Sequence, residues 1–228
     1  MANRDLRLTA LFYDGWIEHV FGHEVRFQRN PWYFDPNHEW WSPTPQEFVG
    51  CLTHLFERPE QLFDMFADSQ IAQGLTYLID TSAIGDDGHL ANPAVPIADR
   101  LRLVRSIEIL FERLFARRCT PHLSHLDEPG VGVLNGRCYM WWDTFPSLAL
   151  PGDAHLTVLQ EAALAAMKKI LALDSVACQE SALHGLGHWH SLQPDRVESI
   201  VDGFLAAHPT ARRELVTYAR SARCGCVL

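Results

Sequence analysis

The chain has 228 residues, of which 47% are apolar and 21% are charged. This composition is that of a globular protein with enough chain to bury a substantial core, and it excludes a disordered one. No apolar run approaches the roughly 20 residues that a membrane-spanning helix needs. The first residues show neither the apolar segment nor the cleavage site of a secretion signal. We therefore expect a cytoplasmic protein.

The formal net charge is −9, from 28 acidic and 19 basic side chains. Nucleic acids and anionic membranes are bound through basic side chains, so this charge disfavours both as partners. It favours a basic protein partner, because opposite charges speed the encounter of two proteins. Solubility alone is the simpler explanation of the same charge. The sequence leaves the oligomeric state open.

The six cysteines show no spacing typical of a disulfide framework, and we interpret them as thiols, most of them buried. Cys224 and Cys226 form a Cys-x-Cys pair that could take part in metal or redox chemistry. No second pair accompanies them, so we expect a frayed tail at this position instead.

Helix signals in the N-terminal part of the chain, residues 1–152, are irregular. Thr44 and the proline after it open one helix, and Pro59 opens a short one. Apolar residues three and four apart predict further helices over 69–79 and 96–118. Alternation of apolar and polar residues is absent, so we expect no substantial sheet.

Three segments, 31–45, 80–93 and 119–151, interrupt the helical pattern. The first carries an aromatic cluster from Trp32 to Trp41, which we expect to cap the end of the helical stack. The second holds glycines and acidic residues without the spacing of a calcium loop. The third contains His122 and His125, which match no zinc pattern together with the nearby cysteines.

The third segment also contains the sequence Cys-Tyr-Met-Trp-Trp-Asp at 138–143. Its residues Trp141, Trp142 and Asp143 fall in a predicted loop, where a packed core would not demand them. Clustered aromatic residues can cap a helical stack or form the centre of an interface with a partner. Both interpretations stay open, and we take these three residues as candidate binding residues.

The C-terminal part, residues 153–228, is the most regular, with helices predicted over 156–173, 175–190, 194–207 and 211–223. Pro194 suits a first helical turn, and Thr210 can cap the last helix. The short connections require successive helices to be antiparallel neighbours. Helix starts recur at intervals of 38 residues, from Leu156 to Pro194, and of 36 residues, from Ser175 to Ala211.

The sequence Ser-Ala-Leu-His-Gly-Leu-Gly-His at 181–188, followed by Pro194 and the apolar residues Val197, Ile200 and Val201, resembles HEAT-type repeats over about 70 residues. The resemblance implies a helical-hairpin array and a protein-binding role. We therefore predict an all-α protein with one helical domain over 1–228. Residues 1–152 would form its irregular helices and aromatic loops, and 153–228 a HEAT-like α-solenoid fragment. The pairing of 138–143 with 178–189 is also similar to some bacterial proteins of unknown activity.

The segment 178–190 is the strongest candidate for a functional site. On a helix, Glu180, His184 and His188 lie four residues apart along one side. Helical winding directs them away from the mean apolar direction, so we expect them to be exposed or to face a groove. Gly185 and Gly187 would let another helix approach closely. We take the three polar side chains as candidate binding residues.

Two histidines four residues apart can hold a zinc ion, but three residues on one straight helix cannot surround it. A further ligand would have to be His155, His190, His208 or an acid from the aromatic segments. The zinc-protease signature also needs a glutamate directly after the first histidine, where this chain has Gly185. We therefore expect no metal and no cofactor.

The sequence favours a non-enzymatic protein-binding module, since it combines a helical array, an acidic surface and no catalytic signature. Small acidic binders of this kind are similar to immunity proteins, which neutralise a basic toxin or enzyme. The alternative is a metal-dependent hydrolase that uses His184 and His188, with Glu180 as ligand or base.

Overall fold

The computed structural model describes residues 10–25, 30–37, 41–79, 91–144 and 152–227. All regular elements of these residues are helices and none is a strand, so the predicted all-α class is confirmed. None of these helices is long and apolar enough to cross a lipid bilayer. Most of the predicted loop 80–93 and the aromatic residue Trp40 lie outside the described residues.

The described residues form a series of helices joined by short segments, and the helices of 153–228 lie close to their predicted positions. The chain forms α1 (Ala10–Phe21), α2 (Pro45–Glu57), α3 (Asp68–Ile79), α5 (Ile97–Leu110), α6 (Ala116–Arg118), α7 (Val133–Tyr139), α8 (Trp141–Thr144), α9 (Leu156–Leu171), α10 (Val176–Trp189), α11 (Pro194–Ala207) and α12 (Arg213–Arg223). Single turns of 3-10 helix occur at Trp32–Phe34, Pro59–Leu62 and Ser124–Leu126. Three helices, α1, α7 and α8, were not predicted.

Local capping explains why several helices begin where they do. The Thr44 side chain accepts a hydrogen bond from the backbone N–H of Glu47, whose carboxylate accepts from the Thr44 backbone in return. Ser175 caps α10 by accepting from the Cys178 N–H. The predicted cap at Thr210 is wrong, because α12 begins at Arg213, three residues later.

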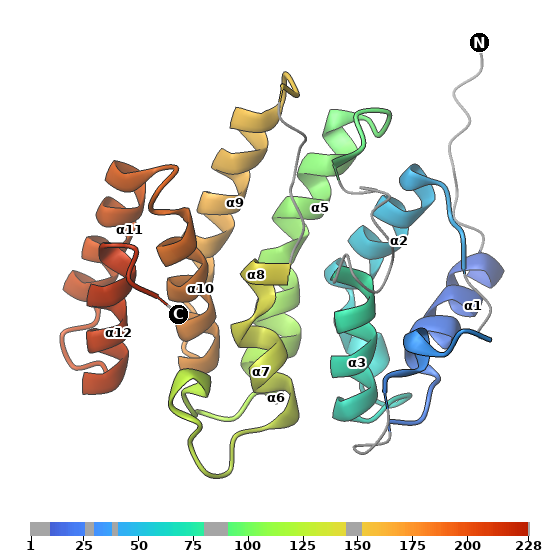
Figure 1. Ribbon diagram of the computed structural model, residues 1–228, viewed down its shortest axis with the longest axis horizontal. Coiled ribbons are helices and arrows are strands. Elements are labelled where there is room, and N and C mark those ends of the chain that lie inside the picture. Colours follow the sequence, from blue (N-terminus) through green and yellow to red (C-terminus); the bar gives the residue numbers. More distant parts are fainter. Residues whose placement is uncertain (1–9, 26–29, 38–40, 80–90, 145–151, 228) are drawn as a thin grey trace.

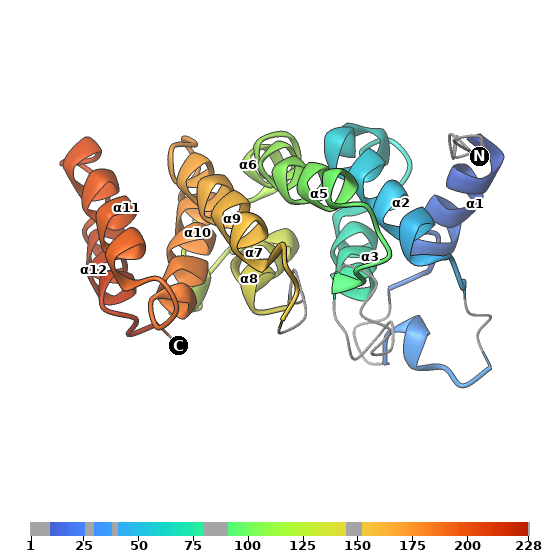
Figure 2. The same cartoon turned by 90° about the horizontal axis from the view of Figure 1, so that it is seen from above.

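The helices lie side by side in a row from α1 to α11 and α12 (Figure 1). Seen from above, α2, α5, α9 and α11 follow one another along one side, while α3, α7, α10 and α12 follow along the other (Figure 2). Helix α5 packs between α2 and α9, and α10 packs against α7, α8, α9, α11 and α12. Helix α10 is therefore enclosed by neighbours on most of its circumference.

The predicted helix 96–118 is interrupted by a turn of π-helix at Phe111–Phe115. Its side chains Phe111 and Phe115 are fully buried, and both rings meet the edge or face of Trp141 at centroid distances of 5.8 Å. Such π-turns locally widen a helix and expose backbone carbonyls to other donors. Here the Cys178 thiol of α10 approaches the Phe111 carbonyl oxygen at 3.9 Å.

The aromatic segment near residue 32 packs against α1 and α3. The Trp32 ring stacks on His23 with centroids 4.0 Å apart, and the Tyr33 ring stacks on Tyr77 at 5.5 Å. Trp41 meets Phe12 of α1 at 5.4 Å. These contacts pack the segment against the first helices of the row, whereas its predicted role as a cap of a helical stack stays a prediction.

The segment between α6 and α7 is held on both sides by polar contacts. The buried Asn135 amide accepts from the Thr120 N–H and donates to the Thr120 carbonyl, each at 2.9 Å. The Glu128 carboxylate accepts from the Leu123 N–H and pairs with the Arg212 guanidinium. The Arg212 hydrogen bonds, followed by that of the Leu123 N–H, lower the pKa of Glu128 to about 2. The loop is thereby fixed against α12, where it covers one side of α10.

Candidate functional site

The polar side of α10 is largely buried, contrary to the prediction. The side chains of Glu180 and His184 are 0% exposed, whereas that of His188 is 43% exposed. The expectation of an exposed stripe is therefore wrong for the first two residues and confirmed for the third. The winding of one helix cannot reveal that the 119–132 loop and α12 cover this side.

Glu180 binds the loop and takes no part in the histidine cluster. Its carboxylate accepts hydrogen bonds from the backbone N–H groups of Ser124 at 2.9 Å and His125 at 3.0 Å. It also lies 2.6 Å from Nδ1 of the His125 ring. Three donors compensate the loss of water around a buried carboxylate. Glu180 is thus neither a metal ligand nor a base in this geometry, and its role is to anchor the loop.

His184 is held from both sides of its ring. Nδ1 lies 2.6 Å from the hydroxyl of Tyr218, and Nε2 lies 3.0 Å from the Asp143 carboxylate. The Tyr218 hydroxyl lies in turn 3.1 Å from that of Tyr139. Burial lowers the pKa of His184 and outweighs the raising effect of Asp143. The ring is therefore neutral near pH 7, with one N–H and one lone pair.

Three potential ligand atoms converge at the exposed end of this arrangement. His188 Nε2 lies 3.0 Å from Asp143 Oδ1 and 3.1 Å from His184 Nε2. Ligands of a tetrahedral zinc ion at 2.0–2.1 Å would lie about 3.3 Å from one another. The observed separations differ from this value by only a few tenths of an ångström. Asp143, His184 and His188 can therefore hold one metal ion with little movement.

Asp143 reaches the histidines because α8 lies directly against α10. A Cβ atom at Gly185 would stand 2.5 Å from Cγ of Trp142, closer than any real contact. The indole of Trp142 occupies the space that the missing side chain leaves, and Asp143 is the next residue along the chain. Gly185, next to His184, thus brings the carboxylate within reach of both imidazoles. Packing is the role that the sequence favoured for this glycine.

Trp141, Trp142 and Asp143, the candidate binding residues of the aromatic segment, differ in their burial and in what they contact. Trp141 is 0% exposed and Trp142 is 7% exposed, and both lie on helix α8 instead of in a loop. The expectation that they lie in a loop outside the packed core is therefore wrong. Asp143, whose side chain is 22% exposed, is the member that lies beside His184 and His188. It is the acid from the aromatic segments that the sequence offered as a further ligand.

The other candidate ligands are not part of this cluster, since His155, His190 and His208 lie outside the group of converging atoms. His208 Nδ1 instead lies 3.0 Å from the Phe204 carbonyl oxygen, and His190 faces Glu198 at 3.6 Å. Sequence reasoning missed the supporting residues Tyr139 and Tyr218. No regular sequence spacing relates them to His184, because they come from α7 and α12 and contact His184 only in the folded chain.

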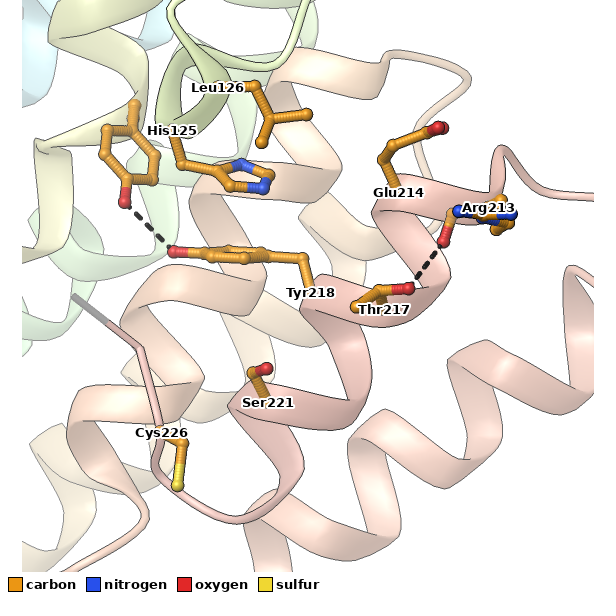
Figure 3. A pocket seen from close by; sticks show the side chains of 9 residues that line it. His125, Leu126, Arg213, Glu214, Thr217, Tyr218, Ser221 and Cys226 are labelled. Atoms are coloured by element: carbon orange, nitrogen blue, oxygen red, sulfur yellow. Dashed lines mark hydrogen bonds between the residues drawn. The ribbon is translucent and has the colours of Figure 1, made fainter.

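A pocket of about 470 Å³ lies beside the cluster, between the 124–126 turn, α7 and α12. Figure 3 shows Tyr218 crossing it, with the His125 ring stacked on one face at a centroid distance of 4.2 Å. Tyr139 and Tyr218 line this pocket and also support His184. The pocket and the cluster of Asp143, His184 and His188 therefore share one wall.

Comparison with protein-family models, with curated proteins and with solved structures finds no match to this chain. The function of the cluster therefore has to be inferred from its own geometry and chemistry.

We predict that Gly185→Ala destabilises the protein by about 1–3 kcal/mol, because the added methyl group overpacks the contact with Trp142. The matched control is Gly203→Ala in α11, where the described residues place no atom within 4 Å of the added Cβ. That change should stabilise the protein by up to about 1 kcal/mol through helix propensity. Urea unfolding of the two variants measures both free energies. Equal stability of the two variants would contradict the packing role of Gly185.

Proposed function

We propose that the protein is a metal-dependent hydrolase whose ion is bound by Asp143, His184 and His188. The observation that carries the proposal is the convergence of three ligand atoms at 3.0–3.1 Å from one another. The sequence alone favoured no metal, since two histidines on one helix lacked a partner. Asp143, from a different helix, supplies that partner.

Catalytic zinc sites have three protein ligands and leave one position for water, whereas structural sites are closed by four ligands. The partial exposure of His188 and Asp143 leaves room for such a water molecule on the solvent side. Zinc held by these three residues would supply an activated water, a nucleophile for a carbonyl or phosphoryl centre. Asp143, His184 and His188 would hold the ion, and the shape of the open side would select the substrate.

We expect protein purified without a histidine tag and stripped by a chelator to bind one Zn²⁺ per chain. Asp143→Asn, His184→Gln and His188→Gln should each weaken zinc binding by more than the roughly 100-fold that loss of a supporting residue costs. Titration against a chromophoric chelator measures the affinity. The loaded protein, but not the stripped one, should hydrolyse activated esters or phosphodiesters of p-nitrophenol.

His208→Gln is the matched control, because it removes a histidine that lies outside the cluster. Its zinc affinity should equal that of the wild type. Zinc binding that survives all three ligand substitutions would refute the site. Zinc binding without any hydrolysis would leave a metal site but refute the hydrolase.

Tyr218 supports the ion through His184, so Tyr218→Phe should weaken zinc binding by about 10- to 100-fold. A histidine that binds a metal through Nε2 carries its proton on Nδ1, and the Tyr218 oxygen accepts that proton at 2.6 Å. Phenylalanine keeps the ring stacked on His125 but removes the acceptor. The same chelator titration measures the change, and circular dichroism monitors folding. An unchanged affinity in a folded variant would contradict this role.

Protein binding remains a second proposal. Four of the eight large apolar side chains that are exposed in the described residues lie between residues 126 and 140: Leu126, Val131, Val133 and Met140. Exposed apolar side chains are typical of contact surfaces where they form a patch, and these four are close in sequence. The HEAT-like hairpin array proposed for 153–228, the net charge of −9 and the six free thiols would suit a cytoplasmic, immunity-type binder of a basic protein.

If this second proposal holds, the immobilised protein should retain a basic partner from an extract of its own cells and release it as salt is raised. The double variant Leu126→Ser and Val133→Ser should lose at least about tenfold in affinity through lost apolar burial. Leu192→Ser, which changes an exposed apolar residue on another part of the chain, is the control. Equal loss in the control and the double variant would contradict the assigned surface.

A further inference from the structure

The chain after α12 is ordered, and Cys226 lines the lower end of the pocket in Figure 3. The N–H of Cys226 donates to the Ser221 carbonyl at 2.9 Å, and that of Gly225 donates to the Ala222 carbonyl at 3.1 Å. Gly225 has a φ of +72°, the left-handed conformation that ends many helices with this pair of bonds. The predicted frayed tail is therefore wrong, and this end of the pocket is preformed.

The opposite end of the pocket holds a histidine whose ring is fixed by a buried carboxylate. His125 Nδ1 lies 2.6 Å from the Glu180 carboxylate, which is 0% exposed. An ionised carboxylate can only accept, so Nδ1 carries the ring proton. Stacking on Tyr218 at a centroid distance of 4.2 Å also fixes the plane of the ring. In the neutral ring, Nε2 has a lone pair that makes no hydrogen bond within the described residues and can accept one from a ligand.

Arg213 is a charged lining residue of the pocket that has no carboxylate partner within the described part of the chain. The neighbouring acid of the lining, Glu214, pairs instead with Arg212 at 3.0 Å, and Arg212 also pairs with Glu128. A guanidinium binds a carboxylate through two parallel hydrogen bonds. The free charge at Arg213 therefore suits an anionic group of a ligand.

The rest of the lining suits a flat apolar body. It includes the Leu126 side chain and the rings of Tyr139 and Tyr218, whose hydroxyls lie 3.1 Å from each other. The volume of about 470 Å³ is that of pockets that hold small organic molecules. Such pockets combine apolar walls with a few polar groups that orient the ligand.

We propose that this pocket binds an aromatic carboxylate that carries a hydroxyl group. The carboxylate binds the Arg213 guanidinium, the hydroxyl donates to His125 Nε2, and the aromatic body lies against the apolar walls. The inference does not rest on the metal-dependent hydrolase proposed above, because Asp143, His184 and His188 do not line the pocket.

The test is a fluorescence titration of the full chain with 6-hydroxy-2-naphthoate, for which we expect one saturable site per chain. Two matched compounds each lack one polar group: 2-naphthoate has no hydroxyl, and 2-naphthol has no carboxylate. Each should bind about tenfold more weakly, because it loses one of the two hydrogen-bonded contacts. Equal affinity of the three compounds for the wild-type protein would overturn the proposal. Absence of saturable binding would also overturn it and would leave the zinc measurements unaffected.

Two variants assign the contacts to their residues. His125→Phe keeps a ring against Tyr218 but removes Nε2. It should weaken the binding of 6-hydroxy-2-naphthoate by about tenfold and leave that of 2-naphthoate unchanged. Arg213→Gln should weaken the binding of both naphthoates by about tenfold and leave that of 2-naphthol unchanged.

Arg220→Gln is the matched control, because it removes another exposed arginine of α12 that lies outside the pocket. It should bind all three compounds as the wild type does, and circular dichroism monitors the folding of each variant. Equal losses in the Arg213 and Arg220 variants would contradict the assigned anion contact. A folded His125→Phe variant that still distinguishes the hydroxylated naphthoate from 2-naphthoate would contradict the role of His125.

Discussion

The contact between Gly185 and Trp142 is the constraint on which the candidate site depends. Glycine inside a helix costs up to about 1 kcal/mol relative to alanine, yet α10 has one immediately after His184. Its missing side chain lets the indole of α8 approach the backbone of α10. Burial of the indole stabilises the fold, and the same contact sets the position of Asp143. This one packing contact therefore contributes both to the hydrophobic core and to the position of Asp143.

Around this contact, buried polar groups require partners from three other parts of the chain. His184 needs Tyr218 of α12 and Asp143 of α8, and the Glu180 carboxylate needs the backbone of the 124–126 turn. Leaving any of these groups unpaired in the interior would cost about 1–3 kcal/mol. The loop is in turn fixed by the ion pair between Glu128 and Arg212. The His184 ring is therefore oriented by the fold itself.

Sequence patterns predicted the helices of 153–228 to within about two residues, because apolar periodicity, prolines and caps are local signals. They did not predict α7 or α8, since both lie in short segments where no helical period can be established. The burial of Glu180 and His184 could not be predicted either. Their partners lie 56 and 34 residues away in sequence, at Ser124 and Tyr218. A histidine spacing can suggest a metal site, but the third ligand is supplied by tertiary packing.

The cluster and the neighbouring pocket are linked by the protons they share. Without an ion, the Nε2–H of His184 donates to Asp143, and its Nδ1 accepts from the Tyr218 hydroxyl. If the proposed ion were held by Nε2, the ring proton would lie on Nδ1 and donate to the Tyr218 oxygen, whose own proton could then point to Tyr139. An ion at this site would thus reverse the hydrogen bonds along two tyrosines that line the pocket. The proposed ion would therefore change the hydrogen bonding of the pocket wall as well as that of His184.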